Sequence, residues 1–277
     1  MASTPPRPRR DPTALALSLG FAFLIVLAVA ATLFARGRWW LPPVASAQGV
    51  EIDRLFRVTF VILSIAFVLV HGLLALFVWR FRARGEERAS YWHENRTLEA
   101  AYTIIPAIVM ITLTVIAAGL WGRIHSPPPP DALVVEVRAE QFTWLARYPG
   151  RDGVFGRIDS KQYDRERNPM ALERGDPAGR DDIVANELHL VVNRPVRLRL
   201  RSKDVIHSFY VPALRVKQDA VPGITVETWF TPTRLGRFQV VCAELCGVGH
   251  YVMVRPLVVE SEQAFNVWLA AQRPKQP

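Results

Sequence analysis

The sequence lacks several features that would identify common classes of protein. It has no Cys-x-x-Cys-His motif, so no haem is attached covalently to this chain. It has no basic stripe with interleaved aromatic residues, so the net charge of +9 does not indicate a nucleic-acid partner. Asp, Glu, Lys and Arg are absent from three runs, 15–35, 58–79 and 100–122. Each run is long enough to cross a bilayer as a helix.

These runs predict an anchor followed by a domain. Half of the residues are hydrophobic and the mean hydropathy is +0.13, which is too apolar for an ordinary soluble domain. We therefore predict a membrane anchor over 1–125, with spans near the three runs. Pro127 to Pro130 lie in a stiff spacer, 126–131. An exported domain is predicted over 132–277.

The distribution of arginines predicts the orientation in the membrane. Eight arginines lie before the first run or between the second and third, and five lie at the opposite ends. By the positive-inside rule, the N-terminus is cytoplasmic and the C-terminal domain is on the outer, periplasmic side of the inner (plasma) membrane. The first run could instead be a signal peptide cleaved near Ala45-Ser46-Ala47. We favour a retained helix, because the apolar part is long and Arg36 to Pro43 separate it from that site.

The exported part has the pattern of an all-β domain. Short β-branched runs separated by turn signals predict a small sandwich or barrel. The predicted strands are Leu133–Arg138, Leu188–Val192, Val196–Leu200, Ile224–Phe230, Phe238–Val241 and Val252–Val259. Residues Tyr148–Asn186 form a long polar surface excursion to which we assign no role. Residues Ser261–Gln272 predict a short capped helix.

The segment from Cys242 to Met253 concentrates metal-binding side chains. It reads Cys-Ala-Glu-Leu-Cys-Gly-Val-Gly-His-Tyr-Val-Met, and His207 is a further candidate ligand. Two thiols, an imidazole and a thioether favour copper, because sulfur ligands select soft ions. Two alternatives remain. Zinc would use two Cys and two His without Met, and a disulfide would leave His250 and Met253 unexplained.

The pattern Cys-x-Glu-x-Cys-x-x-x-His-x-x-Met, with a His about thirty-five residues upstream, resembles the dinuclear copper A (CuA) site of cytochrome c oxidase subunit II. The resemblance implies that two Cys sulfurs bridge two coppers, each His binds one copper, Met binds one and the Glu carbonyl binds the other. These residues are Cys242, Cys246, His207, His250, Met253 and Glu244. The resemblance also implies that the Glu244 side chain reaches a magnesium ion at the boundary with subunit I.

The resemblance implies a fold as well. It is that of a membrane-anchored α+β chain, in which transmembrane helices precede a cupredoxin-like Greek-key barrel and a short C-terminal helix. The first apolar run and the 148–186 excursion are additions to the family's common two-helix pattern.

Two further stretches are similar to this family. Leu98-Glu99-Ala100-Ala101-Tyr102-Thr103-Ile104-Ile105-Pro106 resembles the start of its last membrane helix, where the matching carboxylate helps protons to reach subunit I. Glu99 is that residue here. Glu140-Gln141-Phe142-Thr143-Trp144 resembles the segment that receives electrons. The family's first Trp is replaced by Phe142, so Phe142 and Trp144 are both candidates for electron uptake.

The resemblance implies an electron-transfer subunit. It would accept electrons from a soluble or membrane-bound cytochrome c and pass them to the haem of subunit I, which works with other oxidase subunits to reduce oxygen to water and pump protons. The alternative is a membrane-tethered copper carrier, which gives no reason for Glu99. A nitrous oxide reductase would need a large additional catalytic domain, for which this chain has no room. A quinol donor is disfavoured, because quinol oxidases lose the cysteines.

Overall fold

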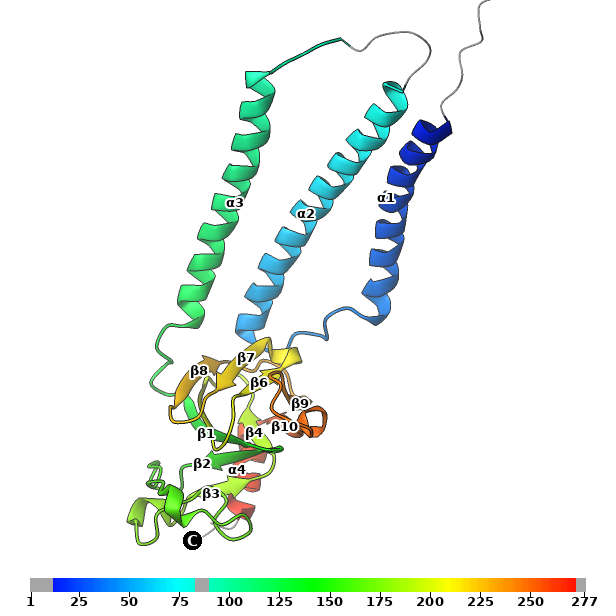
Figure 1. Ribbon diagram of the computed structural model, residues 1–277. Coiled ribbons are helices and arrows are strands. Elements are labelled where there is room, and N and C mark those ends of the chain that lie inside the picture. The colour runs from blue at the N-terminus through cyan, green and yellow to red at the C-terminus, as the bar shows by residue number, and fades with distance from the viewer. Residues whose placement is uncertain (1–11, 83–89, 273–277) are drawn as a thin grey trace, which may run out of the picture. The chain divides into compact units, whose positions relative to one another are not determined.

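The computed structural model describes residues 12–82 and 90–272. Three long helices come first: α1 (Pro12–Arg38), α2 (Ala47–Arg80) and α3 (Arg96–Ile124) (Figure 1). All three are long and apolar enough to cross a membrane, by length and composition. The chain divides into two compact units, residues 1–40 with 54–117 and residues 41–53 with 118–277.

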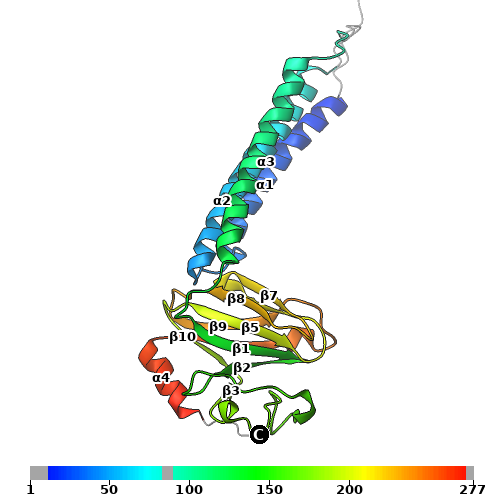
Figure 2. The ribbon, with the colours of Figure 1, turned by 90° about the vertical axis from the view of Figure 1, so that its left-hand side faces the viewer.

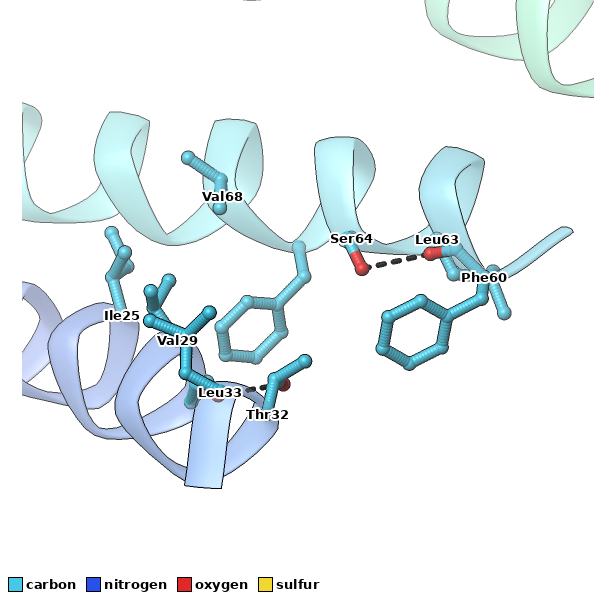
Figure 3. Close-up of a pocket in the computed structure, with 10 residues that line it drawn as sticks. Ile25, Val29, Thr32, Leu33, Phe60, Leu63, Ser64 and Val68 are labelled. Atoms are coloured by element: carbon cyan, nitrogen blue, oxygen red, sulfur yellow. Dashed lines mark hydrogen bonds between the residues drawn. The ribbon is translucent and has the colours of Figure 1, made fainter. Parts of the chain in front are cut away.

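In the first unit, α1 and α2 lie side by side. The Ser18 hydroxyl donates to the Ala75 carbonyl across them at 2.7 Å. An apolar groove of about 500 Å³ runs between the two helices (Figure 3). The groove hydroxyls of Thr32 and Ser64 donate to carbonyls one turn earlier in their own helices, at 2.8 and 2.7 Å. The groove is therefore lined by apolar surface and internally satisfied hydroxyls, as expected of helices that face hydrocarbon.

The second unit holds two five-stranded sheets (Figures 1 and 2). The first has the order β3 (Ile183–Ala185), β2 (Thr143–Tyr148), β1 (Leu133–Glu140), β5 (Val196–Ser202), β8 (Val226–Phe230). The second has the order β4 (Leu188–Val191), β10 (Val254–Glu260), β9 (Gly236–Cys242), β6 (His207–Val211), β7 (Val216–Ala220). All six predicted strands occur; β2, β3, β6 and β7 were not predicted.

The core of this unit draws on both sheets. In β1, Val135 and Val137 are buried in it, as are Leu198 in β5 and Phe209 in β6. The alternation of side chains along each strand sends every second residue to this interior. The predicted cupredoxin-like sandwich with its C-terminal helix is confirmed. Ser261 caps that helix, α4 (Glu262–Ala271), by accepting a hydrogen bond from the Ala264 N–H at 3.2 Å.

The opposite face of the first sheet is also buried, which the sequence did not suggest. Residues 149–186 cover it and form a second small apolar cluster there. Its members are Leu145, Met170, Leu172 and Val184. Tyr148–Asn186 is thus a cover packed on the sheet rather than a simple surface excursion, and it contains β3. The reason is physical: alternate residues of β1 are charged and β2 adds Arg147, and a covering segment supplies partners for these charges.

We call the charged residues between this cover and the sheet the ion layer; they are Glu136, Arg138, Glu140, Arg147 and Asp182. Arg147 is 1% exposed and pairs with Glu136 at 3.1 Å and with Asp182. Burial raises the pKa of Asp182 in spite of its bonds to Arg147. The Asp182 carboxylate therefore depends on the Arg147 guanidinium to stay ionised.

The segment that joins α1 to α2 belongs to the second unit. Ala45 and Ser46 have no exposed surface. The Ala45 N–H donates to the Ala213 carbonyl at 2.8 Å, and the Ser46 hydroxyl donates to the Leu214 carbonyl at 2.5 Å. Arg215 pairs with Asp53 at 2.8 Å. The proposed cleavage signal is thus an integral part of the domain's packing.

Candidate metal centre

Strand pairing brings the predicted ligands together. β6 pairs with β9 in a register that sets Phe209 opposite Cys242. His207 begins β6 two residues earlier and so lies beside the end of β9. The Cys242 N–H donates to the Met253 carbonyl at 3.2 Å and closes the loop between β9 and β10. The register between β6 and β9 thus places His207, thirty-five residues before Cys242, beside the cysteine loop.

Five side chains converge at this point. Ligand atoms of His207, Cys242 and Cys246 all lie within 4.8 Å of one another. The two Sγ atoms are 3.8 Å apart and both thiols are free. Nδ1 of His207 lies 3.9 Å from the Cys242 sulfur, and Nδ1 of His250 lies 3.6 Å from the Cys246 sulfur. The Met253 sulfur is 3.8 Å from that of Cys246. The disulfide alternative is therefore wrong for this structure.

Glu244 approaches the cluster through its main chain. Its carbonyl oxygen lies 3.2 Å from the Cys242 sulfur. Its side chain is exposed. The carbonyl of Glu244 therefore faces the cluster, and the carboxylate is free to meet solvent or a partner.

The loop is shaped by two glycines and an aromatic ring. Gly247 has φ +133°, a conformation that L side chains rarely adopt. A Cβ added at Gly249 would lie 2.4 Å from the Phe142 ring, and one at Gly247 would lie 3.2 Å from it. Phe142 thus packs directly on the loop backbone, and residues larger than glycine would displace the ring.

Asp204 orients the first imidazole and ties it to the aromatic segment. Its Oδ1 lies 2.8 Å from Nε2 of His207, which leaves Nδ1 of that ring for a metal. Its Oδ2 accepts the Gln141 N–H at 2.8 Å. Burial alone would raise the pKa of Asp204, but hydrogen bonds from His207, Gln141 and Val205 offset this and lower it. The Gln141 side chain donates to the Cys246 carbonyl at 2.6 Å.

Neither Asp204 nor Gln141 was predicted as a site residue. The spacing Asp204-x-x-His207 is the one sequence signal that could have found the carboxylate.

The Cys246 thiol is poorly suited to ionise by itself. Burial raises the pKa of Cys246 to about 11, and the neighbouring Cys242 adds to the shift. A cation bound between the sulfurs would oppose both effects, because a coordinated thiol loses its proton. Two cysteine sulfurs that are not joined in a disulfide, beside two imidazoles and a thioether, therefore fit a soft metal. Zinc does not account for Met253.

The two aromatic candidates occupy different environments. Trp144 is 3% exposed; its ring contacts His207 and Phe209, and its Nε1 lies 3.4 Å from the Met253 carbonyl. Phe142 is partly exposed and packs on the loop. Of the two, Phe142 is the one that a partner can touch.

Glu99 lies in the other unit of the chain. It is exposed in the first turn of α3, a helix whose start is capped by the Asn95 side chain. The structure shows no contact of its carboxylate among the residues described.

Comparisons with known proteins identify the family of this chain. The periplasmic domain of cytochrome c oxidase subunit II matches residues 133–262, and the transmembrane domain of the same subunit matches residues 35–119. An alternative cytochrome c oxidase subunit 2 of Bradyrhizobium diazoefficiens is 38% identical over 253 residues, which cover 90% of either chain. The chain belongs to the cytochrome c oxidase subunit II family. This family contributes subunit II to an oxidoreductase complex of the haem-copper type.

Other relatives of subunit II are more distant. The cytochrome c oxidase subunit 2 of Cereibacter sphaeroides is 31% identical, over 83% of this chain and 79% of the relative. A crystal structure of the periplasmic domain of subunit II from Bradyrhizobium japonicum is 30% identical. It covers 54% of this chain and 99% of its own length, with a TM-score of 0.40. The apolar helices anchor this subunit II chain in a membrane.

Proposed function

We propose that this subunit II chain holds a dinuclear copper centre, CuA, that receives electrons from a cytochrome c and passes them to the haem of subunit I. The observation that carries this proposal is the pair of free, neighbouring sulfurs with two imidazoles beside them. The copper ligands would be Cys242 and Cys246 as bridges, His207, His250 and Met253, and the Glu244 carbonyl. Two bridged coppers would share one electron with little change in bond lengths.

The residues around the cluster hold its geometry. Asp204 keeps the imidazole of His207 in one tautomer and orientation. Gln141 holds the backbone of Cys246, and the buried Trp144 ring contacts His207. A ligand set held in place before the electron arrives is what low-reorganisation electron transfer requires.

Exposed apolar side chains next to the ligands support an interface with subunit I. Leu245 is 80% exposed and Tyr251 is 81% exposed, and each is adjacent in the chain to a predicted ligand. Large exposed apolar side chains are typical of surfaces that a partner covers. The exposed Glu244 carboxylate would hold magnesium at this boundary. A membrane-tethered copper carrier would use the same ligands but gives no reason for Glu99 at the start of the last membrane helix.

We further propose that the chain crosses the inner (plasma) membrane three times, with the copper domain on the periplasmic side. The anchor would extend over 1–125, the spacer over 126–131 and the exported domain over 132–277. Residues 41–53 pack with the exported domain although they precede two of the spans.

The decisive test is copper analysis with electron paramagnetic resonance on the full chain in detergent. The full chain is needed because residues 41–53 pack into the copper domain. We expect two coppers per chain and a mixed-valence signal that is lost in Cys242→Ser and in Cys246→Ser. Ser126→Ala, outside the cluster, serves as the control that retains it. One copper per chain, or zinc, would contradict the proposal.

The role of Glu99 in proton uptake is tested separately. Glu99→Gln should slow turnover of the assembled oxidase and leave the copper signal intact, because the substitution removes a titrating carboxylate but no ligand. The matched control is Glu94→Gln, an exposed carboxylate just before the same helix. Equal proton uptake in both variants would remove this assignment.

A further inference from the structure

A histidine lies deep within the second apolar run of the chain. Of the three uncharged runs, 58–79 alone contains a histidine, His71. It lies nine residues before Arg80, the last residue of α2, so about 13 Å of helix separate the two. That length is almost half of a hydrocarbon core about 30 Å thick. Polar side chains at such a depth are costly unless they are paired.

Only one side of the His71 ring has a hydrogen-bond partner. Its Nδ1 lies 2.9 Å from the carbonyl oxygen of Phe67, one turn earlier in α2. A carbonyl only accepts, so Nδ1 carries a proton, and an uncharged ring then has a lone pair on Nε2. The ring packs on Phe67 and meets Phe21 of α1 edge-on, and neither of these offers an N–H or O–H group. Within residues 12–82 and 90–272, no group donates to Nε2.

The apolar groove between α1 and α2 begins next to this ring. Its lining includes Phe67 of α2, which the His71 ring contacts, and extends along α1 from Ile25 (Figure 3). The hydroxyls of Thr32 and Ser64 in the groove both donate within their own helices. His71 differs from them, because its Nε2 still needs a donor.

This unpaired nitrogen decides which kind of molecule fits the groove. Lipid chains would fill apolar space but carry no hydrogen-bond donor, and phospholipid headgroups stay at the bilayer surface. A soluble protein does not enter hydrocarbon. A transmembrane helix meets both needs, since its apolar side chains can fill the groove and a hydroxyl or amide on it can reach Nε2.

We propose that the groove between α1 and α2 seats a transmembrane helix of another oxidase subunit, and that a hydroxyl or amide group of this helix donates to Nε2 of His71. Most of α1 precedes residue 35, where the match to the family's transmembrane domain begins. The groove is thus built in part by a helix outside that match. The inference rests on the proposed three-span topology, in which α1 is retained, and is independent of the copper centre.

The first test is photo-crosslinking in cells that assemble the whole oxidase. The photoreactive residue p-benzoylphenylalanine is placed at Val29, which lines the groove. Irradiation should join it to a peptide from a membrane span of another oxidase subunit, identified by mass spectrometry. Adducts with lipid alone, or no adduct with a subunit, would contradict the proposal.

The matched control places the same photoreactive residue at Phe23 of α1. Phe23 is 63% exposed and two residues from both Phe21 and Ile25, so it lies on the opposite face of the helix. We expect this position to give little of the subunit adduct. An equal yield of that adduct at both positions would show that the groove is not a specific seat.

The second test asks whether His71 holds the partner. With the photoreactive residue at Val29, His71→Leu should lower the yield of the subunit adduct by about threefold or more, the effect of one hydrogen bond between membrane helices. His71→Gln should restore most of it, because its amide oxygen replaces the acceptor. Ser64→Ala is the control, since this groove hydroxyl is bonded within α2. An unchanged yield in His71→Leu, or an equal loss in Ser64→Ala, would overturn the role of His71.

The mass of the purified chain separates the possible failures. A chain cleaved near Ala45-Ser46-Ala47 would have lost α1, and the three-span topology and the docking proposal would fail together. A chain that retains α1 but gives no subunit adduct overturns the docking proposal alone. The mixed-valence copper signal is recorded on the same samples, and its presence or absence tests only the copper centre.

Discussion

The metal cluster and the ion layer are two buried polar sites of one domain, and they differ in how their groups are satisfied. In the ion layer, Arg147 meets its carboxylates at hydrogen-bond distance. In the cluster, the sulfur and nitrogen atoms stand 3.6 to 3.9 Å apart. A structural site pairs its own charges, whereas a site for an ion leaves its ligand atoms without strong mutual bonds. Spacing between polar atoms therefore distinguishes the two kinds of site.

The largest expected effect breaks the ion layer. Arg147→Met leaves Glu136 and Asp182 buried without their cation, so the free energy of unfolding should fall by about 3–5 kcal/mol. The loss should be smaller at lower pH, because a buried carboxylate with a raised pKa takes up a proton more readily in the folded state than in the unfolded state. Denaturation of the full chain in detergent, followed by tryptophan fluorescence at two pH values, measures both effects.

A matched control uses an exposed arginine of the same cover. Arg157 pairs with Glu173 at 2.7 Å but its side chain is 71% exposed. Arg157→Met should therefore lower the free energy of unfolding far less than Arg147→Met does. Equal losses in the two variants would show that burial does not set the strength of the ion layer.

A smaller effect is expected at the cluster, and it should depend on metal. Copper that binds only the folded state stabilises it by about 2.7 kcal/mol when its free concentration is a hundred times the dissociation constant. Thermal unfolding of the unmodified chain should therefore shift upward with added copper, and that of Cys242→Ser should not. A shift of the same size in the variant would mean that copper binds elsewhere.

The smallest effect concerns the cover at acid pH. Backbone N–H groups donate to Asp164 and to Asp176, and these bonds lower the pKa of either carboxyl. A lowered pKa contributes stability above the unfolded value that is lost as the pH falls through the folded value. Amide exchange in residues 149–186, corrected for intrinsic rates, should therefore increase below about pH 4. Amides of β9 and β10 serve as the reference; a parallel increase there would indicate general unfolding instead.

Local patterns in the sequence were sufficient for a large part of this structure. The uncharged runs predicted three helices, because hydrocarbon leaves a backbone few alternatives. The spacing of Cys242, Cys246, His250 and Met253 predicted a metal loop, because all four lie within twelve residues. Short β-branched runs between turn signals predicted six strands. They did not predict β2, β3, β6 or β7; β6 and β7 mix polar and apolar residues.

Only the tertiary structure decided which residues far apart in the chain contact one another. The placement of His207 beside Cys242 depends on the register between β6 and β9. The packing of the Phe142 ring on Gly249 depends on how the turn between β1 and β2 is placed against the metal loop. The burial of Ser46 and Arg147 depends on segments that pack over them. Composition and periodicity report on the neighbours of a residue along the chain. Register and packing are set by the whole fold, since the free energy of each distant contact depends on all the others that form with it.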